Sequence, residues 1–257
     1  MEIELVKSEL DIQNGALVLL GDLHHGNQSP SDQFLEQKAL NYLNKHKDYR
    51  IALNGDLIDN PQMSKLPTEK VTSVDEELAI TSERLKPLYD QIDCVCWGNH
   101  EERTFREPFG KGVAQNTLYG HFSLAEEIKD VNPMLKYAPL MRGIHLQLHT
   151  PREVASVLIK HGCKAGVTRH FTEFEECLQI YQDVDYIMIS HTHRPFIAPF
   201  CKIVSDGTVK QGWFIRGGAF TSWLPYQENR NMPPSTIGFV KVPVSNGRIQ
   251  QPEIVVL

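Results

Sequence analysis

The stretch Ala16–His24, ALVLLGDLH, joins a short apolar run to a polar, ionisable ending. An apolar run of this length is typical of a strand that is buried on both faces. Asp22 and His24 stand two residues apart where the strand ends, so both side chains can point to the same side. A single D-x-H is a weak signal, because a hydrogen-bonded turn would explain it equally well. The pattern gains meaning only because it recurs.

Four later apolar runs end in the same kind of polar cluster. They cover residues 49–53, 92–97, 154–160 and 186–189, and they lead into Asn54-Gly55-Asp56, Gly98-Asn99-His100, His161-Gly162 and Ser190-His191-Thr192-His193. Helices are predicted between them, over Asp32–Lys47 with Ser31 as N-cap, Val74–Tyr89, Val113–Lys129 and Thr172–Tyr181. This alternation predicts crossover connections around a central sheet.

The C-terminal third has a different pattern. Strands are predicted over Trp213–Phe220, Ile237–Val244 and Arg248–Val256, with turns at Ser205-Asp206-Gly207 and Ser245-Asn246-Gly247 and no helices between them. We expect an antiparallel region on the same core, and a single domain over residues 1–257. The segment Thr221–Ser235 is rich in proline, asparagine and aromatic residues. It is predicted to be a long ordered loop, suited equally to binding or to surface packing.

Composition narrows the class of protein. The 257 residues carry 26 basic and 32 acidic side chains, so a net charge of −6 gives no footprint for duplex nucleic acid. We find neither a signal-peptide pattern nor a run of roughly 18 apolar residues, so no membrane association is expected. The odd number of cysteines, five, favours reduced thiols in the cytoplasm. Cys94 and Cys96 are predicted to pack in the core, and nothing indicates the oligomeric state.

The residues at the predicted strand ends are of the same few chemical types. Five strands deliver aspartate, histidine or asparagine at the same kind of terminus. In open α/β sheets, sites form at the carboxyl ends of strands. Imidazole and carboxylate ligands without thiolates suit manganese, iron, zinc or cobalt. One bridging carboxylate could hold two such ions about 3.5–4 Å apart, as in two-metal hydrolases.

The ordered motifs resemble those of the calcineurin-like metallophosphoesterase superfamily. That family has D-x-H, G-D-x-x-D, G-N-H-D/E, a histidine and G-H-x-H. The matching residues are Asp22-Leu23-His24, Gly55-Asp56-Leu57-Ile58-Asp59, Gly98-Asn99-His100-Glu101, His161 and His191-Thr192-His193. Ser190 departs from the family's glycine. The resemblance implies an α/β fold, a four-layer α/β/β/α sandwich of two mixed sheets flanked by helices.

The resemblance also implies the roles of the site residues. One metal ion would be held by Asp22, His24 and His193, the other by Asn99, His161 and His191, and Asp56 would bridge them. We prefer His161 to His145 and His149 because it follows a long apolar strand and precedes Gly162. The expected cofactors are two divalent metal ions, first of all Mn²⁺, with iron, zinc, cobalt and nickel as alternatives.

The implied reaction is hydrolysis of a phosphodiester or phosphomonoester. A hydroxide bridging the metals attacks in line, His100 protonates the leaving oxygen as general acid, and Asp59 orients its imidazole. His25 either supports the site or lies on the surface, and Glu101 is assigned no role. Arg103, Arg194 and Arg216 could each bind a phosphate, but surface positions are commoner for arginine, so none is assigned.

Three alternatives stay open. A metal-dependent DNA nuclease related to recombination nucleases ranks second, because the chain is acidic and is expected to lack a DNA-binding extension. A protein serine/threonine phosphatase ranks third, because Asp59 is followed by Asn60-Pro61 where that group has arginine and glycine. The last is a catalytically silent binding scaffold, which is disfavoured because His100 and every ligand position are filled.

Overall fold

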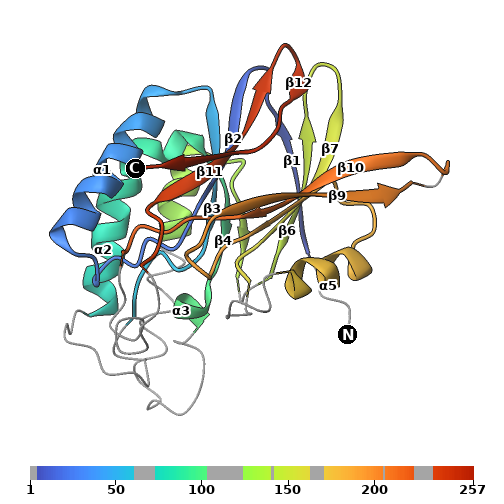
Figure 1. Ribbon diagram of the computed structural model, residues 1–257. Coiled ribbons are helices and arrows are strands. Elements are labelled where there is room, and N and C mark those ends of the chain that lie inside the picture. Colours follow the sequence, from blue (N-terminus) through green and yellow to red (C-terminus); the bar gives the residue numbers. More distant parts are fainter. Residues whose placement is uncertain are drawn as a thin grey trace.

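The computed structural model describes residues 5–60, 73–102, 124–139, 142–162, 171–204, 206–222 and 234–257. Within these ranges the strands form two sheets that face each other (Figure 1). The first sheet contains β2 (Gly15–Leu20), β3 (Tyr49–Asn54), β4 (Ile92–Cys96), β5 (Lys136–Ala138), β11 (Gly238–Ser245), β12 (Arg248–Ile249) and β13 (Glu253–Val256). The second contains β1 (Val6–Asp11), β6 (Ile144–His149), β7 (Val154–Lys160), β8 (Tyr186–Ile189), β9 (Phe196–Ile203) and β10 (Val209–Arg216).

Helices cover the outer faces of both sheets. The helices α1 (Pro30–Lys45) and α2 (Val74–Leu85) lie on the first sheet, and α5 (Thr172–Ile180) lies on the second (Figure 1). A 3₁₀ turn, η2 (Lys86–Gln91), follows α2, the short α3 (Asn99–Glu102) follows β4, and residues 124–131 are also helical. Both sheets mix parallel and antiparallel pairs. The expected four-layer α/β/β/α sandwich is therefore confirmed.

The apolar runs are continuous because their strands are buried on both faces. In β2, Val18 and Leu20 pack under the helices, whereas Leu17 and Leu19 pack between the sheets. Burying one such leucine stabilises the fold by roughly 1.5–3 kcal/mol. Cys94 and Cys96 lie in the same inter-sheet layer, as the sequence predicted. No helix in the described ranges has the length and apolar character needed to cross a bilayer.

Helix boundaries correct some of the sequence predictions. Ser29, not Ser31, is the N-cap of α1: its hydroxyl accepts from the Asp32 N–H at 3.1 Å, and Asp32 accepts in return from the Ser29 N–H at 3.2 Å. This capping box places Pro30 in the first turn, where its missing N–H costs nothing. The predicted helix Val74–Tyr89 stops at Leu85 and continues as η2. Of the predicted helix Val113–Lys129, residues 113–123 lie outside the described residues.

The pairing of the strands confirms one expectation and corrects another. The two sheets are those that the family resemblance implied, whereas the strand–helix alternation had predicted a central sheet, because alternation does not say which strands pair. The predicted strand Trp213–Phe220 is β10, which begins at Val209 and ends at Arg216, and Arg248–Val256 splits into β12 and β13. Antiparallel pairing holds for β9–β10 and around β11, but β10 pairs with β8 in parallel.

The topology brings the polar strand ends to one side of the molecule. The parallel pairs β2–β3–β4 in one sheet and β7–β8–β10 in the other end near each other. Asn54 joins the two sheets at this side, since its amide donates to the Lys160 carbonyl oxygen at 3.0 Å and to the Ser190 hydroxyl at 3.1 Å. Residues that follow these strands are therefore held together.

Candidate metal centre and active site

Left-handed backbone conformations gather at these strand ends. Among the described residues, positive φ angles at non-glycine positions occur at Asp22 (50°), His24 (50°), Asp56 (49°), Asn60 (48°), His191 (77°), His193 (57°) and Asn246 (53°). Five of these are predicted metal ligands, whereas Asn246 lies in the β11–β12 turn. Each such conformation costs of order 1–3 kcal/mol and persists only where the surroundings enforce it. Strain concentrated in this way is typical of functional sites, so these strand ends are the candidate site.

The first cluster of ligand atoms comprises Asp22, His24 and His193. All three side chains are buried, and their ligand atoms lie within 4.8 Å of one another. His193 Nε2 is 3.4 Å from Asp22 Oδ1 and 3.0 Å from His24 Nε2. Burial acts to raise the pKa of Asp22, but His193 outweighs it, and the pKa lies below its usual value. Asp22 is therefore an ionised carboxylate among imidazoles.

The second cluster comprises Asp56, His161 and His191, again with ligand atoms within 4.8 Å of one another. His161 Nδ1–H donates to the Asn54 carbonyl oxygen at 2.6 Å, which leaves Nε2 facing the cluster. That Nε2 lies 3.2 Å from Asp56 Oδ2 and 3.2 Å from Asn99 Oδ1. Burial opposes the charged form of His161, but Asp56 raises its pKa to about 10. Burial and the neighbouring His161 lower the pKa of His191 to about 4.

Asp56 lies between the two clusters. Its Oδ2 is 3.2 Å from His161 Nε2, 3.8 Å from His100 Nε2 and 3.9 Å from His24 Nε2. Its Oδ1 accepts the backbone N–H of His100 at 2.9 Å. Although burial would raise the pKa of Asp56, His100 and His161 hold it well below the usual range. One carboxylate thus reaches imidazoles from both groups.

Asp59 contacts His100 in two ways. Its carbonyl oxygen accepts from His100 Nδ1–H at 2.6 Å, which leaves Nε2 as the nitrogen facing Asp56. Its carboxylate lies 3.5 Å from His100 Nδ1 and 3.3 Å from His24 Nδ1. The rings of His24 and His100 meet edge to face at 4.5 Å. The main chain of Asp59 therefore fixes the tautomer of His100, while its carboxylate lies close to both imidazoles.

These residues fit a divalent metal ion. Asp22 Oδ1 and His191 Nδ1 are buried without a hydrogen-bond partner. A buried polar atom left in that state costs about 1–3 kcal/mol, and coordination would offset the cost. The donors are imidazole nitrogens and carboxylate oxygens, which suit transition metals such as manganese, iron or zinc. The clusters are typical of dinuclear metallophosphoesterases, and they leave the identity of the metal open.

The sequence pattern of the calcineurin-like phosphoesterase family matches residues 16–195, which include every residue of both clusters. The chain belongs to this family. No curated protein sequence matches it.

Two solved structures resemble this phosphoesterase-family chain. One is the crystal structure of a conserved protein from Streptococcus pneumoniae TIGR4, described as a predicted phosphoesterase, with 13% identity, a TM-score of 0.40, and coverage of 95% of this chain and 90% of that one. The other is the solution NMR structure of a Thermotoga maritima protein, with 13% identity, a TM-score of 0.39, and coverage of 95% and 99%. Values this low support no statement about function.

Glu101 is a site residue whose contribution the sequence did not show. Its buried carboxylate accepts backbone N–H groups from Asp56 at 2.9 Å, Leu57 at 2.7 Å and Gly98 at 2.7 Å. The two turns that it joins are in such close contact that a Cβ at Gly98 would lie 2.1 Å from Asp56 Oδ1. Glu101 therefore holds Asp56 in place. The only available signal was its position in the Gly-Asn-His-Glu motif.

His25 is buried, so its surface interpretation is wrong. Its Nδ1 lies 2.7 Å from Thr81 Oγ1 and its Nε2 lies 2.7 Å from Glu36 Oε1. Glu36 also accepts from Arg84 Nη1 at 2.8 Å, and burial is outweighed by His25 and Arg84 so that the pKa of Glu36 falls below its usual value. This network ties α1 and α2 to the turn that carries His24.

The remaining candidates lie apart from the clusters or outside the described residues. His145 projects from β6, with Nε2 2.6 Å from Ser156 Oγ, and His149 ends the same strand, so His161 is the histidine that meets Asp56. Arg216 is fully buried rather than exposed. Arg194 is half-buried. Arg103 and residues 223–233 of the predicted loop lie outside the described residues.

Proposed function

We propose that this member of the family is a dinuclear metal-dependent phosphoesterase that hydrolyses phosphodiesters or phosphomonoesters. The observation that carries the proposal is the position of Asp56, whose one carboxylate reaches His161 at 3.2 Å and His24 at 3.9 Å. Such a carboxylate is what two neighbouring cations would share. Because residues of both sheets contribute to the site, we also propose that residues 1–257 form one domain.

The proposed ligands divide as the clusters do. Asp22, His24 and His193 would hold one ion, Asn99, His161 and His191 the other, and Asp56 both. Two bound cations would supply a nucleophile from water at neutral pH and neutralise charge on the phosphate oxygens. We propose Mn²⁺ as the native metal, on the basis of the imidazole and carboxylate donors.

His100 is proposed as the general acid. Its Nδ1–H is committed to the Asp59 carbonyl oxygen, so the proton available for transfer sits on Nε2, which faces the site. The carboxylates of Asp56 and Asp59 lie 3.8 Å from its Nε2 and 3.5 Å from its Nδ1. The ligand atoms of His24, Asp56 and His100 also lie within 4.8 Å of one another, so these three residues form a third group that could hold a metal ion. We assign proton transfer to His100 because both proposed metal sites are filled without it.

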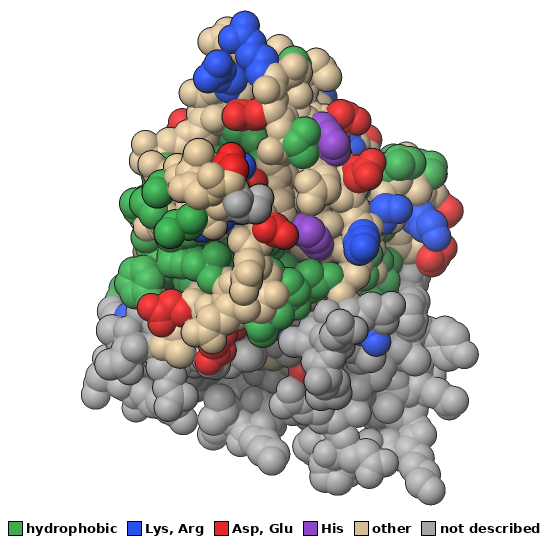
Figure 2. Space-filling view, turned by 90° about the vertical axis from the view of Figure 1, so that its right-hand side faces the viewer, with side chains coloured by type: hydrophobic (Ala, Val, Ile, Leu, Met, Phe, Trp, Pro, Cys, Tyr) green, Lys and Arg blue, Asp and Glu red, His purple; other side chains and the backbone are tan. Residues whose placement is uncertain are grey.

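The charge of the chain agrees with a small phosphate ester rather than duplex nucleic acid as substrate. Figure 2 turns the right-hand side of Figure 1 toward the viewer, and acidic and basic side chains are interspersed over the described part of this face without forming a basic stripe. The net charge of −6 points the same way.

The four described cysteines, Cys94, Cys96, Cys177 and Cys201, are free thiols, which supports a proposed location in the cytoplasm.

The decisive assay is hydrolysis of bis-p-nitrophenyl phosphate and p-nitrophenyl phosphate by chelator-treated protein across a series of added divalent metals. We expect no turnover without metal and restoration by manganese. The ratio of diester to monoester rates would then define the substrate class. Folded protein that binds metal but hydrolyses neither ester, and leaves single- and double-stranded DNA intact, would favour a binding scaffold and overturn the proposal.

A further inference from the structure

Arg216, at the end of β10, is among the least exposed side chains of the described chain, with 0% of its surface accessible. Arginine is rarely buried to this degree unless its charge is paired, because desolvating a guanidinium costs several kcal/mol. A fully buried side chain cannot bind a substrate phosphate at the surface. Its role must come from what it contacts inside the protein.

The guanidinium contacts the turn after β8, the helix α5 and the start of β9. Its Nη1 donates to Thr192 Oγ1 at 3.2 Å and to the Ser190 carbonyl oxygen at 3.4 Å. Its Nη2 lies 3.9 Å from the buried carboxylate of Glu173 on α5. The guanidinium also lies over the rings of Phe174 and Phe196, at 5.1 Å and 5.6 Å from their centroids. Cation–π contacts of this kind favour one fixed position of the charge.

The contacts of Arg216 fall on the turn that carries two proposed ligands. Thr192 stands between His191 and His193, both of which have left-handed backbone conformations. The Ser190 carbonyl oxygen that faces Arg216 also accepts the Thr192 N–H at 3.0 Å. On the other side, Asp22 Oδ2 accepts the His191 N–H at 3.0 Å. The turn is thus hydrogen-bonded to the Asp22 carboxylate on one side and to the Arg216 guanidinium on the other.

We infer that Arg216 is a positioning residue that fixes His191 and His193 by binding Ser190 and Thr192 from beneath. This inference rests on the proposed metal site, since it gives the fixed histidines their purpose. Partners that hydrogen-bond metal ligands directly typically contribute 10- to 100-fold in metal affinity, and Arg216, which acts through the turn between the ligands, is expected at the lower end of that range. Because His191 and His193 belong to different clusters, both proposed metal sites should depend on Arg216.

The test uses Thr192→Val, which keeps the volume of the side chain and removes the hydroxyl that Arg216 binds, together with Arg216→Lys and Arg216→Met. The matched control is Arg50→Met, because Arg50 is also paired with a carboxylate, at 2.7 Å from Asp93, but at the opposite end of β3. Two quantities are measured: the imidazole ¹⁵N–¹H resonances of the metal-free protein, and the dissociation constants for Mn²⁺ by titration calorimetry.

In Thr192→Val we expect the resonances of His191 and His193 to move and Mn²⁺ binding to weaken roughly tenfold. Arg216→Lys should change both quantities by less, and Arg50→Met should leave both as in the wild-type protein. Unmoved resonances and unchanged affinity in Thr192→Val would overturn the inference, even if Arg216→Met fails to fold. Absence of Mn²⁺ binding by the wild-type protein would instead refute the proposed metal site. The resonances of the metal-free protein would still decide the role of Arg216.

Discussion

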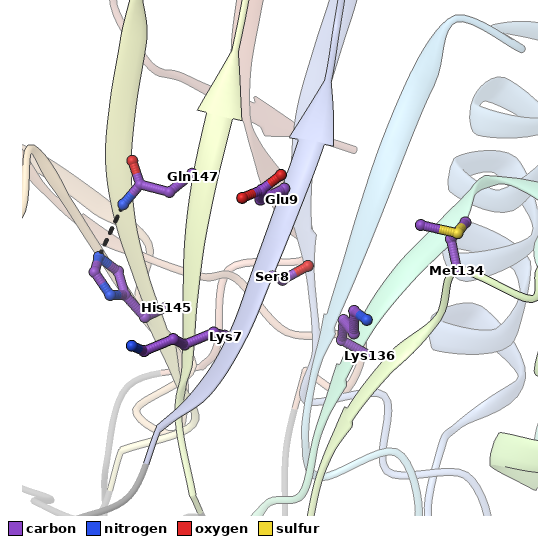
Figure 3. Close-up of a pocket in the computed structure, with 7 residues that line it drawn as sticks. All are labelled: Lys7, Ser8, Glu9, Met134, Lys136, His145 and Gln147. Carbon is purple, nitrogen blue, oxygen red and sulfur yellow. Dashed lines mark hydrogen bonds between the residues drawn. The ribbon is translucent and has the colours of Figure 1, made fainter.

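The strand-end site and the groove along β1 both contain histidine, carboxylate and serine, yet they differ in every physical respect. The groove has a volume of about 500 Å³ and runs between the edge strands β1 and β5, lined by Lys7, Ser8, Glu9, Met134, Lys136, His145 and Gln147. Figure 3 shows Lys7 and Glu9 on the same side of the sheet as His145 and Gln147, with Ser8 pointing toward Lys136. Its polar groups are therefore divided between the two faces of the sheet.

The two regions also differ in how fully their polar atoms are hydrogen-bonded. His145 already has Ser156 Oγ at 2.6 Å and the Gln147 amide at 3.3 Å, and burial with the nearby Lys7 lowers its pKa. At the strand ends, by contrast, Asp22 Oδ1 and His191 Nδ1 are buried without such partners, and the backbone is strained. Convergent, incompletely bonded ligand atoms thus indicate function in this protein, whereas the size of a groove does not. Substitutions in each region test this difference.

The largest effect is expected from Asp56→Ala, which removes the carboxylate shared by both clusters. We expect loss of metal binding and a fall of hydrolysis to background, measured by metal analysis of the dialysed protein and by p-nitrophenyl ester turnover. Glu9→Ala is the matched control in the groove and should behave as wild type. A folded Asp56→Ala protein with its full metal content would remove the distinction between the regions.

A smaller effect is expected from His100→Ala. Loss of a general acid lowers kcat by roughly 10²–10⁴-fold, while the metal content should remain that of the wild-type protein because both proposed metal sites keep their ligands. His145→Ala provides the histidine control and should leave kcat unchanged. If His100→Ala instead loses metal at unchanged specific activity per bound ion, His100 is a ligand and the assignment fails.

The stability of metal-free protein should pass through a maximum near the ordinary histidine pKa of about 6.5. The pKa of His191 is lowered to about 4, so the unfolded state binds the extra proton and stability rises with pH between about 4 and 6.5. The pKa of His161 is raised to about 10, so its contribution is complete below 6.5 and is lost as pH rises toward 10. Denaturant unfolding across this range measures the profile.

Saturating metal should reverse the alkaline limb of that profile. Metal binding requires deprotonated imidazole, so stability in excess Mn²⁺ should hold or increase above pH 6.5. Equal slopes with and without metal between pH 7 and 9 would show that the raised pKa of His161 is unrelated to metal binding.

Metal removal at neutral pH should lower the melting temperature moderately. A ligand present at 100 times its dissociation constant stabilises the folded state by about 2.7 kcal/mol, which corresponds to a shift of about 5–10 °C for a chain of this size. Differential scanning calorimetry before and after chelation measures this shift of the melting temperature. An unchanged melting temperature would show that the clusters bind no ion under those conditions.

The smallest effect is expected from Lys136→Ala in the groove. A partly exposed side chain away from a special structural feature changes stability by less than about 0.5 kcal/mol, and hydrolysis should be unaffected. A tenfold fall in kcat/KM for either ester would show that the groove contributes to function as the strand-end site does.

The sequence predicted best the strands that are buried on both faces. The runs of β7 and β8 are found at the predicted residues, and β2, β3 and β4 within one residue at an end, because continuous apolar runs leave little freedom of assignment. In contrast, β1, β6 and β9 were missed. Their side chains alternate between buried and exposed, so the apolar signal is halved along each strand. The pairing into two sheets was implied only by the family resemblance.

The sequence alone shows which chemical groups stand at the strand ends, because the motifs from Asp22 to His193 are local and ordered. Which of these groups contact one another depends on the folding of the two sheets. This folding joined the Glu101 carboxylate to the backbone N–H of Asp56, gave His100 the carbonyl oxygen of Asp59 as its hydrogen-bond acceptor, and buried Arg216 beneath Thr192. Those outcomes depend on contacts across the two sheets and between residues far apart in the chain, which no local pattern contains.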